Sequence, residues 1–251
     1  MEIRRLWRRR LWLALAVVLC LLLAACQAQP PVLIGMAVEL TGRRSEVGVS
    51  ARNGAELAVE AVNADGGVNG APLKLLVQDD QGVPEGALLA DGELAADGVV
   101  AIIGHITSEQ TAAALEQINR LGVVLISPTS SSSALSDMDD HFFRVTSANE
   151  HLAASMARHI YLTRGLHQAL AIYDLSNRSF TETWWEHFAQ EFSRLGGTCQ
   201  ALSFTSGETD LKHLVAGLKA QALEAVVLIA SAVDTALMIQ YAAQEALKAQ
   251  F

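Results

Sequence analysis

Residues 101–127, AIIGHITSEQTAAALEQINRLGVVLIS, decide the fold class of this chain. The nearly unbroken apolar runs at Val99–Gly104 and Val123–Ser127 are typical of strands buried on both faces of a parallel sheet. The segment Ser108–Leu121 is predicted to be a helix, because its apolar face recurs at helical spacing: Thr111, Leu115, Ile118 and Leu121. A strand–helix–strand unit of this length joins two parallel strands through a helical crossover.

The same alternation extends along most of the chain and predicts an α/β fold with parallel sheets. Four more runs are predicted as strands: Val32–Leu40, Lys74–Asp79, Ala169–Asp174 and Ala225–Ala230. Five more segments are predicted as helices: Ser50–Asn63, Leu152–Tyr161, Phe180–Leu195, Leu211–Ala220 and Thr235–Lys248. The alternation pauses in the polar stretch 129–148, which ends in a short strand, and then restarts. We therefore expect two lobes, 26–146 and 147–251.

The first 26 residues, MEIRRLWRRRLWLALAVVLCLLLAAC, are typical of a secretory signal. Five arginines precede an apolar stretch from Leu11 to Ala25, which is too short to span a bilayer comfortably. The stretch closes with LAAC at 23–26, which resembles the bacterial lipobox, in which the cysteine is lipidated. We predict a lipoprotein signal over 1–25 and an exported protein anchored to a membrane by lipid at Cys26. The alternative is an ordinary signal peptide or a short anchor in which Cys26 is incidental.

The composition of the body excludes several function classes. Residues 26–251 hold 13 basic and 26 acidic residues, a formal net charge of −13, so the basic footprint of a nucleic-acid binder is missing. After Cys26 the sequence has only Cys199, so no intrachain disulfide is expected. Nucleophile-elbow, phosphate-loop, dinucleotide and zinc-protease motifs are absent. The histidines at 151, 159 and 167 are too widely spaced to share a metal, and we expect no cofactor and no metal site.

The candidate site lies where three predicted strands end. Ligands of open parallel sheets bind beyond the carboxyl ends of the strands, and these ends read ELTGRRSEVG (39–48), GHITSEQT (104–111) and SPTSSSS (127–133). Ser108 stands at the start of a predicted helix, where its hydroxyl and the free N–H groups of the first turn can receive an anion. The alternative is that Ser108 merely caps its own helix.

Other residues near these loops have plainer interpretations. His105 ends the third strand and is interpreted as a satisfied buried histidine. Arg43 and Arg44 are expected to form a solvated loop tip. Trp184 and Trp185 are interpreted as core and surface packing of a helix rather than as a ligand cage.

The order of these motifs resembles the periplasmic leucine/isoleucine/valine-binding proteins, the type I family of ABC-transporter substrate-binding proteins. That family is related to the ligand-binding domains of natriuretic-peptide and glutamate receptors. The resemblance runs from about Val32 to the end of the chain. AVNADGGVNG (61–70), followed by a strand and two aspartates, is its most specific piece, and IIGH (102–105) followed by threonine and serine is the next.

The resemblance implies two Rossmann-like lobes, joined by a hinge, that close on a small ligand. In the amino-acid-binding members two loops of the first lobe hold the ligand carboxylate, and the corresponding positions here are Ile106, Thr107, Ser108, Thr129 and Ser131. The second lobe of such proteins adds an aromatic wall and an acidic residue for the ammonium group.

The sequence departs from the family pattern at several of these positions. Family aromatics fall on Val47, Arg178 and Ser231, so the pocket is expected to be less aromatic and wetter, and Arg178 is a candidate to meet a second carboxylate of the ligand. Gly82 and Thr107 replace the cysteine pair of some relatives. The ammonium-pairing acid and the closing elements would lie past Phe251, so the chain is expected to be a fragment whose second lobe is incomplete.

The predicted function is that of an extracytoplasmic substrate-binding lipoprotein of an ABC transporter. It would bind an amino acid or a related small carboxylate between its lobes and deliver it to a membrane permease, without catalysis. One alternative is a sensory subunit for an amide or a small organic acid. Another is an α/β enzyme that uses the strand-end loops. The missing catalytic motifs and the lipobox both argue against an enzyme.

Overall fold

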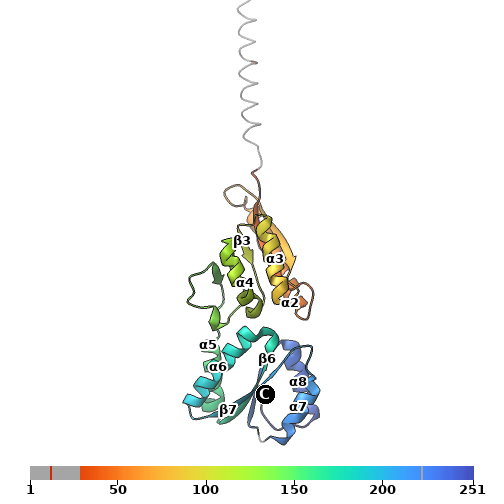
Figure 1. Cartoon of the computed structure of the whole chain (residues 1–251), viewed down its shortest axis with the longest axis vertical. Helices are drawn as coiled ribbons and strands as arrows, with labels where there is room; N and C mark the ends of the chain where they lie inside the picture. The colour runs from red at the N-terminus through yellow and green to blue at the C-terminus, as the bar shows by residue number, and fades with distance from the viewer. Residues whose placement is uncertain (1–11, 13–28, 222) are drawn as a thin grey trace, which may run out of the picture.

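The computed structural model describes Trp12 and residues 29–251 except 222, and the predicted signal and Cys26 lie outside these residues. Two α/β lobes follow one another along the long axis of the molecule (Figure 1). The first has five parallel strands in the order β2-β1-β3-β4-β5. Their bounds are β1 Val32–Val38, β2 Leu73–Asp79, β3 Ala101–Ile103, β4 Val124–Ser127 and β5 Phe142–Arg144. The helices of this lobe are α2 Ser45–Ala64, α3 Pro84–Ala96 and α4 Ser108–Leu121.

The second lobe has three parallel strands in the order β7-β6-β8. They are β6 Gln168–Asp174, β7 Thr198–Phe204 and β8 Ala225–Ile229. The helices are α5 Glu150–Arg158, α6 Arg178–Arg194, α7 Leu211–Gly217 and α8 Ala232–Gln244. Short turns of 3-10 helix lie at Ser133–Leu135, Leu175–Asn177 and Leu218–Ala220, and a π-turn lies at His159–Thr163. Among the described residues, no helix is both long and apolar enough to cross a bilayer.

Each sheet is covered by helices on both faces, as the continuous apolar strands require. Along β6 the side chains alternate between two cores. Ala169 and Ala171 pack with Phe188 and Phe192 of α6, while Ile172 packs on the other face with the core of α7 and α8. In Figure 1 α6 and the α7–α8 pair lie on opposite sides of this sheet.

The predicted α/β fold with parallel sheets is confirmed, and the predicted bounds of α4 are those observed. The bounds of other elements shift: α2 begins five residues before the predicted start. Ala51 and Ala55 of this helix pack toward β1, whereas Val62 is exposed. Helix α3 and strand β7 were not among the predicted elements. Trp184 is buried and stacks on Phe188, and Trp185 packs at the rim of the same core, as predicted.

Gly48 allows α2 to lie directly against the end of β1. A Cβ atom at Gly48 would lie 1.9 Å from the backbone oxygen of Glu39, a contact that only movement of the helix can relieve. Gly48→Ala is therefore expected to lower the free energy of unfolding by about 1–3 kcal/mol, measured by urea denaturation. Gly54 of the same helix is the matched control, because its Cβ would have no neighbour within 4 Å. Gly54→Ala should raise stability by about 0.5–1 kcal/mol, and equal effects at both positions would contradict the packing argument.

Candidate functional site

The loops after β3 and β4 are brought together as the sequence predicts. The Ser108 hydroxyl oxygen accepts hydrogen bonds from the backbone N–H groups of Ser131 and Ser132, each at 3.1 Å. The Thr129 hydroxyl donates to the Ile106 carbonyl at 2.6 Å. Because these contacts join residues more than twenty positions apart, the two loops form one preorganised rim at the carboxyl edge of the sheet.

Thr107, and not Ser108, caps helix α4. The Thr107 hydroxyl oxygen accepts from the Gln110 backbone N–H at 3.4 Å, while Ser108 is the first helical residue and is 2% exposed. The alternative in which Ser108 only caps its own helix is therefore wrong. Its oxygen is used to hold the neighbouring loop, which leaves the hydroxyl proton as a donor.

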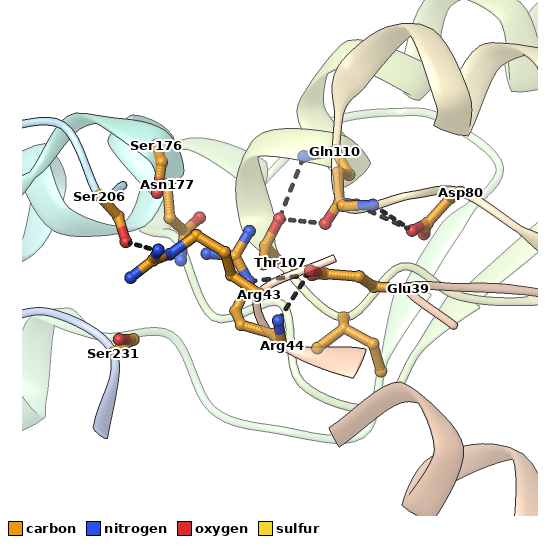
Figure 2. A network of polar contacts seen from close by, with 12 residues as sticks. Glu39, Arg43, Arg44, Asp80, Thr107, Gln110, Ser176, Asn177, Ser206 and Ser231 are labelled. Carbon is orange, nitrogen blue, oxygen red and sulfur yellow. Dashed lines mark hydrogen bonds and ion pairs between the residues drawn. The ribbon is translucent and has the colours of Figure 1, made fainter. Parts of the chain in front are cut away.

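His105 lies beneath this rim between two carboxylates. Its Nδ1 is 2.9 Å from Asp80 Oδ2, its Nε2 is 3.2 Å from Asp91 Oδ2, and none of the three side chains is exposed. Burial lowers the pKa of His105, but the hydrogen bonds and charges of Asp80 and Asp91 outweigh it and raise the pKa to about 9. The prediction of a satisfied buried histidine is confirmed. Asp80 also accepts from Gln110 Nε2 at 3.0 Å, so the buried cluster holds the start of α4 (Figure 2).

The loop after β1 is exposed at Arg43, as the sequence predicts for a solvated tip, whereas Arg44 is half-buried. Glu39 is 1% exposed and accepts from the Arg44 backbone N–H at 2.8 Å and from Arg44 Nε at 3.1 Å. Arg43 extends toward the second lobe, where its Nε lies 3.1 Å from Ser206 Oγ (Figure 2). Sequence reasoning could not predict these pairings, because the partners of Arg43 lie in the other lobe and the pairing of Arg44 with Glu39 depends on how the loop between them bends.

The start of α6 faces the start of α4 across the lobes. The Glu109 backbone N–H donates to Asn177 Oδ1 at 3.2 Å, and Glu109 Oε2 accepts from the Ser179 backbone N–H at 2.6 Å. Each helix thus supplies a side chain that satisfies the first turn of the other. Two positive helix ends converge here, which is a favourable setting for an anion. Glu109 and Asn177 were not singled out from the sequence; the polar loops that contain them were the only signal.

The two predicted residues of the second lobe already have partners in their own lobe. Arg178 Nε and Nη2 lie 2.8 and 3.1 Å from the Glu182 carboxylate, which raises the pKa of Arg178 and lowers that of Glu182. Ser231 caps α8 and donates to Asp234 Oδ2 at 2.8 Å. Val47 lies in the first turn of α2 with 41% of its surface exposed.

A groove of about 440 Å³ lies elsewhere in the second lobe, beside β8. Its lining is mainly apolar and includes Ile160, Leu166, Val227 and Ile239. None of the predicted ligand-binding residues lines this groove, so the rim between the lobes remains the candidate site. Among the described residues, no group of three or more histidine, cysteine or acidic side chains is placed to hold a metal ion.

Comparison with known proteins places this fold in a family. Residues 31–251 match the family described as periplasmic binding protein. The chain belongs to this family. The Leu/Ile/Val-binding protein homolog 1 of Brucella abortus is 26% identical over 223 residues, which cover 88% of this chain and 59% of that protein. A leucine-, isoleucine-, valine-, threonine- and alanine-binding protein of Pseudomonas aeruginosa is 35% identical over 96 residues, or 38% of this chain and 26% of that protein.

Solved structures of periplasmic binding proteins share the fold. A leucine-binding protein of Thermotoga maritima superposes with a TM-score of 0.78 at 22% identity, over 87% of this chain and 61% of that one. A branched-chain amino acid transporter substrate-binding protein of Streptococcus pneumoniae, in complex with isoleucine, gives 0.71 at 24% identity, over 79% and 56%. The family resemblance and the type I fold predicted from the sequence are confirmed. The proteins named here are binding proteins, and this chain spans about 60% of the length of the Brucella and Thermotoga proteins.

Proposed function

We propose that this chain is the ligand-binding part of an extracytoplasmic substrate-binding lipoprotein that serves an ABC transporter. Its ligand is an amino acid or a related small carboxylate, held between the two lobes and passed to a membrane permease. The names of its relatives support this proposal, since they are leucine-, isoleucine- and valine-binding proteins. The signal-like N-terminus and the lipobox at Cys26 support export and a lipid anchor.

The observation that carries the proposal is the contact between Glu109 and Asn177. The first-turn N–H of α4 is directed at the other lobe and donates there to a neutral amide oxygen at 3.2 Å. A carboxylate in the same place accepts a shorter, charge-assisted bond and gains from the positive ends of α4 and α6. Ser108 lies next to this N–H and offers its hydroxyl proton to the same anion.

The proposed binding residues of the first lobe are those that form the rim: Ile106, Thr107, Ser108, Thr129 and Ser131. Arg178 and Ser231 are proposed to line the side of the second lobe. Both stand where the family carries aromatics, and both are polar, so we infer a more hydrated pocket than that of the aliphatic amino-acid binders. To meet a second carboxylate of the ligand, Arg178 leaves its ion pair with Glu182. The Glu182 carboxylate then competes with the ligand carboxylate for the Arg178 guanidinium.

A ligand screen tests this function. Leucine, isoleucine, valine, dicarboxylic amino acids and small organic acids are screened by thermal shift, and each hit is titrated by calorimetry. The matched control for each hit is its amide, which has the same side chain and no carboxylate. We expect the acid to raise the melting temperature and the amide to have a much smaller effect. The proposal is contradicted if only the amides bind saturably, or if none of the carboxylates in the screen binds.

Ser108→Ala tests the rim. The change removes the acceptor of two loop N–H groups and the donor proposed for the ligand, so the dissociation constant of the best carboxylate is expected to rise about ten- to a hundredfold. Ser50→Ala is the control, because Ser50 lies exposed on α2 and bonds only within its own helix. A lowered melting temperature with unchanged affinity would mean that Ser108 anchors the loop and does not meet the ligand.

A further inference from the structure

Arg43 connects the two lobes at a place distant from the segment between β5 and α5, where the chain passes from one lobe to the other. Its Nη2 lies 3.1 Å from Asp234 Oδ1, and its Nε lies 3.1 Å from Ser206 Oγ, although these partners are 191 and 163 positions away in sequence. Figure 2 shows the guanidinium extended from the first lobe toward Ser206. We propose that Arg43 and Asp234 form an interlobe latch that sets how tightly the protein holds its ligand. The effect on ligand affinity rests on the proposed function, whereas the latch itself does not.

The first lobe holds Arg43 in a fixed place. On one side of it, the Asp79 carboxylate accepts from the backbone N–H groups of Leu40 and Thr41, at 2.8 and 3.2 Å. On the other side, Arg44 is tied to the buried Glu39. Gly42 between them has φ of +122°, and a Cβ there would lie 2.4 Å from Glu39 Oε1. A loop fixed at both ends presents Arg43 with little loss of backbone freedom when the latch forms.

The second lobe receives Arg43 with a buried carboxylate. Asp234 is 0% exposed and lies at the third position of α8, where Ser231 caps the helix and donates to Asp234 Oδ2. Ser206 also donates to that oxygen, and its own backbone N–H is held by Asp174 at 3.0 Å. Oδ1 is left to Arg43. The two serines therefore orient the carboxylate so that one oxygen faces the other lobe.

The latch lies far from the segment that connects the lobes, so it can resist rotation of one lobe against the other. Other hydrogen bonds between the lobes gather around α4, the loop after β4 and the start of α6, close to where the chain crosses from β5 to α5; they include Ser132 to Ser179 and Ser133 to His187. Arg43 follows β1, which is separated from β5 by β3 and β4 in the sheet. A contact away from the crossing opposes rotation of one lobe against the other more effectively than one beside it.

The exposure of the Arg43 side chain determines how strongly the latch affects ligand affinity. Half of the Arg43 side chain is exposed (51%), so solvent and salt screen its attraction to Asp234. The latch is therefore a modest bias toward the closed arrangement, and a ligand that binds only this arrangement gains affinity in proportion to its population. We expect Arg43→Ala to weaken ligand binding about three- to tenfold.

The latch is tested by a distance measurement that needs no ligand. Spin labels are placed at Glu60→Cys on α2 and Lys212→Cys on α7, both exposed, with Cys199→Ser to remove the one native thiol among the described residues. Arg43→Ala and Asp234→Asn are each expected to shift the interlobe distances to longer and broader values. Arg43→Lys, which keeps the charge but not the fork of donors, should give an intermediate distribution. Raising NaCl to about 1 M should move the unmodified protein toward the Arg43→Ala distribution.

Arg52→Ala is the matched control, since Arg52 lies on α2 and pairs with Glu56 four residues along the same helix. Arg43→Ala is the decisive variant, because a half-exposed side chain is removed and no core contact is lost. Distances unchanged by Arg43→Ala and by salt, or changed equally by Arg52→Ala, overturn the latch. Affinity is then measured with leucine as the probe. If leucine does not bind the unmodified protein, the proposed ligand fails while the distance measurement still decides the latch.

Discussion

Replacing His105 with leucine is expected to lower the free energy of unfolding by about 3–5 kcal/mol. The change removes the cation between Asp80 and Asp91 and leaves both carboxylates buried. Asp80 retains the Gly82 backbone N–H and Gln110 Nε2 as donors. Asp91 loses more, because among the described residues His105 is the only hydrogen-bond partner of its Oδ2 and its Oδ1 has none. Urea denaturation at pH 7 measures the loss.

A second histidine provides the control for this change. His151 lies at the start of α5 with 90% of its side chain exposed. His151→Leu should change the free energy of unfolding by no more than about 0.5 kcal/mol. The double variant Asp91→Leu with His105→Leu removes the most isolated carboxylate together with its partner, and it should recover part of the loss. A small effect of His105→Leu alone would show that the cluster does not hold a charge at this site.

The sequence predicted two features of the first lobe most closely: helix α4 and the convergence of the loops after β3 and β4. Helix α4 was predicted with its observed bounds, because its apolar side chains follow one clear stripe and its start and end carry ordinary signals: polar Thr107 and Ser108, and Gly122 with φ of +66°. Its strand neighbours are buried on both faces and read as apolar runs. Loops that follow such strands meet at one edge of the sheet, which is why the serines and threonines of two loops could be placed together.

Two elements escaped prediction because their burial does not follow hydrophobicity. In α3 the polar Asp91 is fully buried, since it pairs with His105, whereas Leu89 is 67% exposed. The segment therefore shows no apolar stripe. Among the described residues, strand β7 pairs only with β6 and lies at the edge of its sheet. Thr198 and Leu202 are exposed, and the run is not continuously apolar.

The polar contacts that fix the site were beyond sequence reasoning for a different reason. Arg43 and Asp234 belong to different lobes, and nothing local to either residue specifies the other. Glu39 and Arg44 are five residues apart, yet their pairing depends on a loop bent at Gly42. Local pattern predicts which loops converge, but the pairing of individual side chains is decided by the packing of whole lobes.

The stability of the protein is expected to fall as the pH rises above neutrality. His105 has a pKa of about 9 in the folded protein, above the ordinary value of 6.5 that it has when unfolded. A raised folded-state pKa means that the stabilisation is fully present below pH 6.5 and is lost as the pH rises through 9, because the folded protein must then give up the proton that binds Asp80 and Asp91. The rise of the pKa from 6.5 to about 9 corresponds to roughly 3 kcal/mol of stabilisation at low pH. Urea denaturation between pH 6 and 9.5 measures this loss, and the ring signals of His105 in an NMR titration locate the proton directly. His105→Gln should flatten the stability profile over this range, and a His105 signal that titrates near 6.5 would contradict the buried cation.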